Sequence, residues 1–179
     1  MQKRATIRRM IFMVSACLVL NIGCGHAMEE ADAPVTIFLE LLGNGGIYSV
    51  NADYRLAPAC SVRLGYVAWH AAGFFDEHEE LTAAPLLVNF LAGQGNHWLE
   101  AGVGVLYGHF KSKNSRGELI ENYTFTTLTG SLAYRYQRPH GGAFFKAGLT
   151  PFYSFAKDDK AYPEDGLLPW FGLAGGYSF

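Results

Sequence analysis

The segment Leu167–Phe179 (LLPWFGLAGGYSF) has the clearest two-residue alternation in this chain. Counted back from the last residue, alternate positions form one mostly apolar, aromatic face, which carries Phe171, Leu173, Tyr177 and Phe179 with Gly175 between them. The intervening positions are all small or weakly polar: Gly172, Ala174, Gly176 and Ser178. A two-residue period places unlike side chains on the two faces of a β-strand, so this segment predicts a strand with one apolar face.

The composition suits short apolar strands better than membrane helices. Hydrophobic residues make up 50% of the 179 residues, aromatic residues 15% and charged residues only 17%. The usual charged fraction is about 25%. No segment after the N-terminus offers the roughly 20 continuous apolar residues that a membrane helix needs. We therefore expect a single domain built from short alternating segments.

The N-terminus has the three parts of an export signal. Basic residues (Lys3, Arg4, Arg8 and Arg9) precede an apolar core, 10–22, and a small-residue cleavage site at 25–27. We predict a signal peptide over 1–27, a short periplasmic lead over 28–34 and one domain over 35–179. Removing the signal changes the net charge from −2 to about −6, which argues against nucleic acid as a partner.

Cysteine usage excludes an internal disulfide in the mature chain. Cys17 and Cys24 fall within or beside the signal, which leaves Cys60 alone. Val14–Cys17 also matches a lipoprotein box, although the apolar run continues past it, so lipidation at Cys17 stays open as an alternative.

Turn signals divide the mature chain into eight alternating segments. We expect strands at 35–42, 47–56, 61–71, 81–92, 97–110, 122–137, 142–155 and 167–179. From the second strand onward, short connections (57–60, 93–96 and 138–141) alternate with long polar ones (72–80, 111–121 and 156–166). The first hairpin, with its turn at 43–46, is short for a tilted membrane strand. A single bulged strand over 35–56, and hence an odd number of strands, is the alternative.

Within each strand the face opposite the apolar one mixes small residues with isolated charges. In 47–56, Tyr48, Val50 and Tyr54 alternate with Ser49 and Asp53. Seven charged residues belong to these polar faces: Glu40, Asp53, Arg55, Arg63, Glu100, Arg135 and Lys146. The lumen of a narrow eight-stranded barrel is filled by side chains. Because unpaired charges there would be costly, we expect these seven to pair across the lumen as a structural plug.

The export signal, the strand rhythm and the aromatic terminus together resemble the small Gram-negative outer-membrane β-barrel proteins. The resemblance covers the whole mature chain but identifies no subfamily. It implies an all-β, antiparallel up-and-down transmembrane barrel in the outer membrane, with both mature termini in the periplasm. It also implies contact with outer-membrane lipid and lipopolysaccharide. The final strand, with Phe171, Leu173, Tyr177 and Phe179, would be the signal that the barrel assembly machinery reads.

No catalytic, metal-binding or cofactor-binding residues stand out. Some small barrels that act on lipid A carry a His-x-Ser triplet, and none of the histidines here begins one. The nearest pattern is His109 with Ser112, which fall on opposite faces of a strand unless Ser112 lies in a loop, as we expect. The acidic cluster 76–80 is expected to be a solvated loop rather than a cation site. Trp69, Trp98 and Trp170 are expected in lumen or interface packing.

The function that fits best is a structural or surface-interaction barrel with a filled lumen, without cofactor or catalysis. Three alternatives remain open on the sequence alone: a barrel that binds or transports a small apolar molecule, a lipid-modifying enzyme, and a soluble periplasmic sandwich.

Overall fold

The computed structural model describes residues 33–72, 78–114, 116–154 and 166–179. The predicted signal peptide, most of the lead 28–34 and Cys17 lie outside these residues. The strands are β1 (Val35–Leu41), β2 (Tyr48–Ala57), β3 (Cys60–Ala72), β4 (His78–Gln94), β5 (His97–Lys113), β6 (Leu119–Gln137), β7 (Gly142–Leu149), β8 (Phe152–Tyr153), β9 (Leu167–Leu168) and β10 (Phe171–Ser178). No helix in the described part of the chain is long and apolar enough to cross a membrane.

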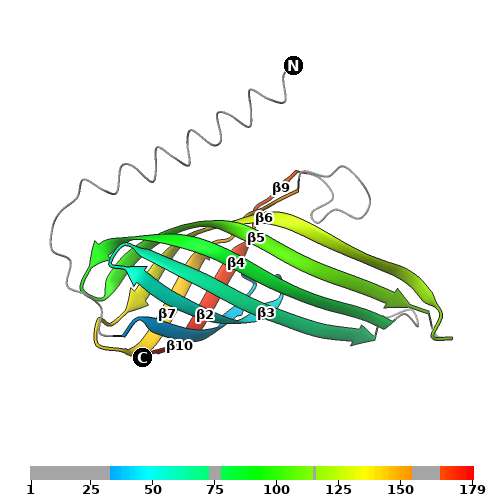
Figure 1. Cartoon of the computed structure of the whole chain (residues 1–179), viewed down its shortest axis with the longest axis horizontal. Coiled ribbons are helices and arrows are strands. Elements are labelled where there is room, and N and C mark those ends of the chain that lie inside the picture. Colours follow the sequence, from blue (N-terminus) through cyan, green and yellow to red (C-terminus); the bar gives the residue numbers. More distant parts are fainter. Residues whose placement is uncertain (1–32, 73–77, 115, 155–165) are drawn as a thin grey trace, which may run out of the picture.

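The strands close into an antiparallel barrel (Figure 1). Each of β1 to β6 pairs with its neighbour in the chain, β6 pairs with β7, and β7 pairs with β10. The last strand then pairs with the first, from Thr36 opposite Ser178 to Leu41 opposite Leu173. The closed barrel has eight strands when β7 with β8, and β9 with β10, are each counted as one interrupted strand. This confirms the predicted fold class and strand number.

Two prolines interrupt the last two barrel strands, β7–β8 and β9–β10, without changing their register. Leu132 lies opposite Leu149 of β7, and Leu128 lies opposite Tyr153 of β8, which is the same alignment along β6. Proline has no N–H to donate to a ladder, so Pro151 and Pro169 break the hydrogen bonding locally. The pairs β7–β8 and β9–β10 are therefore the predicted strands 142–155 and 167–179, each split at its proline.

The first hairpin is real, so the alternative of one bulged strand over 35–56 is wrong. β1 pairs with β2 along its whole length, and the Leu42 N–H donates to the Ile47 carbonyl at 2.9 Å across the turn. Gly46, with φ +86°, supplies the left-handed conformation that this tight turn requires.

The barrel is apolar outside and polar inside. Ile37, Leu39, Val103 and Leu132 are about half exposed, and many other outward-facing side chains are large and apolar as well. Polar and charged side chains make up most of the buried set. A soluble sandwich buries its apolar faces in a shared core, so this inverted distribution excludes that alternative and fits a barrel surrounded by lipid.

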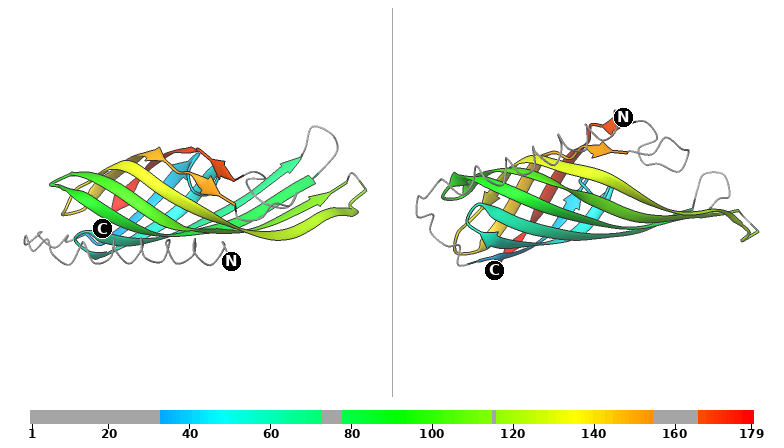
Figure 2. Two further views of the ribbon diagram at one scale, coloured as in Figure 1. Left: turned by 90° about the horizontal axis from the view of Figure 1, so that it is seen from above. Right: turned by 45° about the horizontal axis from the view of Figure 1, so that its top comes forward.

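Four strands extend far beyond the rest of the barrel. β3, β4, β5 and β6 have 13, 17, 17 and 19 residues, whereas β1, β7 and β10 have 7, 8 and 8. Their ends away from the C-terminus form a projecting sheet (Figures 1 and 2). The predicted loop 111–121 is consequently wrong: β5 continues to Lys113 and β6 begins at Leu119, with only a short turn between them.

Candidate functional site: the lumen and its outer mouth

The structure places all seven predicted lumen charges inside the barrel. Glu40, Arg63, Glu100, Arg135 and Lys146 are at most 1% exposed. Asp53 is equally buried, and Arg55 is 9% exposed. They come from β1, β2, β3, β5, β6 and β7, so the cluster links strands around most of the circumference.

Six of the seven form one continuous chain of ion pairs. Glu40 Oε1 accepts from Arg63 Nη1 at 3.1 Å and from Lys146 Nζ at 3.2 Å. Lys146 also contacts Glu100 Oε1 at 3.3 Å. Arg135 then joins Glu100 at 3.1 Å to Asp53 at 2.8 Å. Three acids face three bases, so this chain is electrically neutral and every charge in it has an opposite partner.

Arg55 lies apart from that chain, toward the end of the barrel where the C-terminus is found. Its Nη2 donates to Gln137 Oε1 at 3.0 Å, and its guanidinium stacks over Trp98 with 4.7 Å between the guanidinium carbon and the ring centroid. A cation on an aromatic face is stabilised by the ring quadrupole. Arg55 and Trp98 are thus packed against each other and largely buried.

Neutral polar side chains that the sequence reasoning did not single out complete the cluster. Asn44 binds both Glu40 and Arg63: its backbone N–H donates to Glu40 Oε2 at 3.1 Å, and its side-chain oxygen accepts from Arg63. Asn89 donates to Asp53 at 3.3 Å, and Ser131 donates to Glu100 at 3.0 Å. The strand alternation that identified the charges also points Asn89 and Ser131 inward.

A buried apolar layer lies beyond the charges, toward the projecting sheet. It consists of Val67, Ala83, Leu106 and Phe152, each at most 3% exposed. Trp69, Phe125, Leu168 and Trp170 pack against it. The lumen is thus filled first by paired charges and then by apolar side chains.

Beyond this apolar layer, away from the C-terminus, the outer face of the sheet changes from apolar to polar and the inner face changes from polar to apolar. Within the barrel, β5 turns Leu99, Val103 and Val105 outward and Glu100 inward. Further along the same strand, His109 and Lys111 share the outer face, while Leu106 and Phe110 share the inner face. Residues that lie directly opposite each other in a sheet share a face. The outer-face rung at this point is polar on three strands: Thr82 of β4, His109 of β5 and Thr124 of β6.

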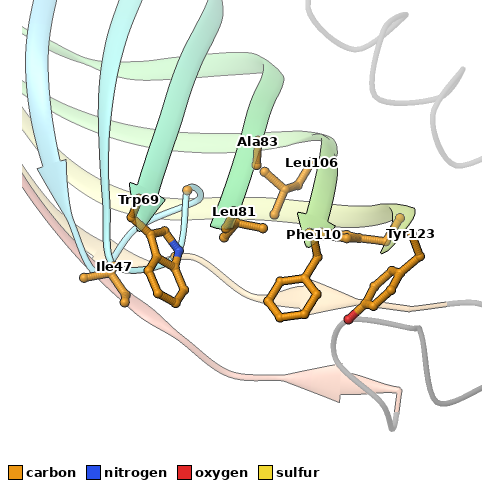
Figure 3. Close-up of a pocket in the computed structure, with 10 residues that line it drawn as sticks. Ile47, Trp69, Leu81, Ala83, Leu106, Phe110 and Tyr123 are labelled. Carbon is orange, nitrogen blue, oxygen red and sulfur yellow. The ribbon is translucent and has the colours of Figure 1, made fainter. Parts of the chain in front are cut away.

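The inner face of the projecting sheet forms an apolar cleft. Trp69, Leu81, Phe110 and Tyr123 lie opposite one another across β3, β4, β5 and β6. Figure 3 shows their side chains projecting from the same side of the sheet, with Ile47 of the β1–β2 turn beside them. The cleft has a volume of about 250 Å³, and Gly45, Gly46, Ala83, Leu106 and Phe125 complete its lining.

The geometry of the barrel is matched by solved structures of outer-membrane proteins. The N-terminal β-barrel domain of Pseudomonas aeruginosa OprF aligns with a TM-score of 0.57 and 19% identity, over 81% of this chain and 95% of that domain. The fold is that of a small outer-membrane β-barrel protein. The attachment invasion locus protein Ail of Yersinia pestis, in complex with the heparin analogue sucrose octasulfate, aligns with a TM-score of 0.50 and 13% identity, over 81% and 95% of the two chains.

No family model matches the chain, and no curated protein matches it significantly.

The His-x-x-Ser pattern does not assemble in the barrel. His109 Nε2 contacts Asn122 Oδ1 at 2.7 Å on the outer face, whereas Ser112 is 5% exposed on the inner face of β5. The expectation that Ser112 lies in a solvated loop is wrong, because β5 runs on to Lys113. The two side chains are thus separated by the sheet.

The acidic cluster 76–80 lies only partly in the described residues. His78, Glu79 and Glu80 belong to β4 rather than to a loop, and residues 76 and 77 lie outside the described part of the chain. Among the described residues, no group of three or more His, Cys, Asp or Glu side chains is placed to hold a metal ion.

The C-terminal strand of the barrel presents its aromatic residues outward. Phe171, Leu173, Tyr177 and Phe179 are between 53% and 66% exposed, and the Tyr177 and Phe179 rings pack at a tilt with centroids 5.0 Å apart. The alternation read from the sequence is therefore present in the fold. Recognition of these residues by assembly machinery stays a prediction.

Proposed function

We propose that this protein is a closed outer-membrane barrel with a structural or surface-interaction role. The observation that carries the proposal is the chain of six ion-paired side chains across the lumen, from Arg63 to Asp53. A conducting pore needs a continuous water-filled path, as in wide porins, whereas a narrow eight-stranded lumen is packed with side chains. The fold similarity to small outer-membrane barrels supports the membrane setting.

The pairing also makes this plug difficult to move. Removing one partner of a buried ion pair costs roughly 3–5 kcal/mol, because the other charge is left without compensation. Opening a path would require breaking several such contacts among Glu40, Lys146, Glu100 and Arg135. The closed lumen leaves the projecting ends of β3 to β6 as the part available for contacts outside the membrane.

We expect the folded protein to give no channel activity in planar lipid bilayers. The protein should be added from detergent after its folding is verified by the faster gel migration of the unheated sample. A porin in the same bilayers serves as the positive control, and boiled protein controls for nonspecific leaks. Reproducible conductance steps of uniform size from the folded sample would overturn the proposed closed state.

We further propose that both mature termini lie in the periplasm and that the projecting sheet lies outside the cell. The short turns at 58–59, 95–96 and 138–141 support this orientation, since outer-membrane barrels have short periplasmic turns and longer outer segments. In this setting the partners are outer-membrane lipid, lipopolysaccharide and the barrel assembly machinery that reads the last strand.

Thiol labelling of intact cells tests the orientation. In a Cys60→Ser background, Arg116→Cys at the exposed β5–β6 turn should react with a membrane-impermeant maleimide. Cys60 in the otherwise unchanged protein should react only after the outer membrane is permeabilised. The reverse pattern would contradict the orientation.

In the same assay, Phe179→Ser should lower the labelled amount of Arg116→Cys protein if the terminal aromatic is part of the assembly signal.

A further inference from the structure

The apolar cleft on the inner face of the projecting sheet has the features of a ligand site. Its four facing side chains, Trp69, Leu81, Phe110 and Tyr123, come from four different strands. Their inner face is apolar where the outer face of the same strands is polar. Water-exposed sheets rarely gather several aromatic side chains in one concavity. Where an exposed apolar concavity does occur, it typically marks a binding site.

The cleft has a buried apolar floor. The buried layer of Val67, Leu106 and Phe152 separates it from the charged lumen. Gly108 lies beneath the Phe125 ring, and a Cβ atom at position 108 would overlap that ring. The absence of a side chain at position 108 therefore leaves room for the Phe125 ring, which is part of the wall.

The volume limits the ligand to a small one. An apolar cavity of about 150 Å³ takes one benzene molecule. A cleft of about 250 Å³ accordingly takes an apolar body of roughly ten carbon atoms. Trp69, Phe110 and Tyr123 supply ring faces and edges that favour a flat aromatic body.

The charge at the rim selects the polar end of such a molecule. The next rung outward on the inner face consists of Glu79, Ser112 and Glu121, which lie opposite one another on β4, β5 and β6. The neighbouring Lys113 is on the outer face, where its Nζ lies 3.9 Å from Glu80. Two carboxylates at the open edge of an apolar site attract a cation and repel an anion.

We propose that the apolar cleft of the projecting sheet binds a small aromatic molecule with a cationic polar end. The apolar body of the molecule lies among Trp69, Leu81 and Phe110. Its positive charge lies at Glu79 and Glu121. The site goes beyond the proposed closed barrel, because its floor is apolar packing rather than the ion-paired plug. An empty cleft would leave the closed barrel standing, because the ion pairs of the plug do not depend on a ligand in the cleft.

Three naphthalene compounds that differ only in the polar end test the site. The full-length mature protein in lipid nanodiscs is dialysed against (1-naphthylmethyl)ammonium, 1-naphthylmethanol and 1-naphthoate, and uptake by empty nanodiscs is subtracted. We expect saturable one-to-one binding in the order cation, neutral, anion, with at least a tenfold difference between the first and the last.

Substitutions in the cleft locate the binding. Leu81→Asp should place a charge in the apolar body of the site, and Phe110→Ala should remove one wall, so each should weaken the neutral compound at least tenfold. Tyr107→Ala, on the outer face of the same strand as Phe110, is the matched control and should leave binding unchanged. Gel migration of unheated samples verifies that each variant is folded.

The rim is tested separately from the apolar wall. The double variant Glu79→Gln and Glu121→Gln should reduce the cation's advantage over the neutral compound to less than twofold, with the neutral compound bound as before. Uptake equal to that of empty nanodiscs, or binding indifferent to Leu81→Asp, would overturn the proposal. Concentration-dependent dimers abolished by Phe110→Ala would overturn it too, because a second copy would then occupy the cleft.

Discussion

Glu100→Ala should destabilise the folded barrel by about 3–5 kcal/mol, the usual cost of removing one partner from a buried ion pair. Glu100 is 1% exposed and binds three groups: Arg135 at 3.1 Å, Lys146 at 3.3 Å and Ser131 at 3.0 Å. Its loss leaves three bases facing two carboxylates in the ion-paired chain, so one buried cation has no compensating charge. Urea unfolding in lipid vesicles, followed by gel migration, measures the change in the free energy of unfolding.

Two further variants show whether charge imbalance causes the loss. Glu80→Gln removes a carboxylate from an exposed pair, 3.9 Å from Lys113, and should change stability by less than about 1 kcal/mol. Adding Lys146→Met to Glu100→Ala removes the one excess cation, so that two acids again face two bases in the ion-paired chain. The double variant should be less destabilised than the sum of the single variants, by about 0.5–3 kcal/mol. Additive losses, or a Glu100→Ala effect no larger than that of Glu80→Gln, would mean that the lumen charges are hydrated rather than paired.

Val103→Arg should cost about 2–4 kcal/mol, because it places a cation on the lipid-facing side near the middle of the apolar band. Val103 is 47% exposed and lies opposite Val88 and Gly130, well inside the outward apolar face of β5. That face runs from Leu99 to Tyr107, about 26 Å along the strand at roughly 3.3 Å per residue. At a tilt of about 40° it spans roughly 20 Å, close to the usual apolar band of such barrels.

Thr124→Arg is the matched control for Val103→Arg. Thr124 also faces outward, but it lies opposite His109, where the outer face has become polar. The same cation there should change the free energy of unfolding by no more than about 0.5 kcal/mol. Folding into vesicles from urea measures both variants. Equal costs at the two positions would show that the lipid boundary lies elsewhere on these strands.

The sequence predicts the barrel strands and the residues that face the lumen well, because both depend on the local alternation of side chains. A period of two assigns each residue to a face without knowledge of its neighbours, and this was enough to direct Glu40, Arg63 and Lys146 inward. The pairing of the last strand with the first follows from closure. Which acid meets which base does not follow, since Glu40 and Lys146 are brought together by the register of three adjoining strands.

The projecting sheet escaped prediction for a different reason. Polar residues such as Lys111 and Lys113 suggest a loop when the outward face of a strand is expected to be apolar. In the fold they form the outer face of strands that have left the apolar band, and Phe110 and Tyr123 have moved to the inner face. The exchange of faces preserves the period of two but reverses its phase. A test for phase reversal along each strand would have found both the sheet and its cleft.

The exchange of faces also fixes how deep the barrel sits in its membrane. Sinking by one residue pair, roughly 5 Å along the normal for a strand tilted by about 40°, would carry Thr82 and His109 into hydrocarbon. Rising by the same amount would carry apolar residues at the end of the belt next to His109, such as Val105, out of the hydrocarbon and into water. Both displacements are opposed on several strands at once. The protein is thus matched to one bilayer thickness, and a thicker membrane would have to thin around it.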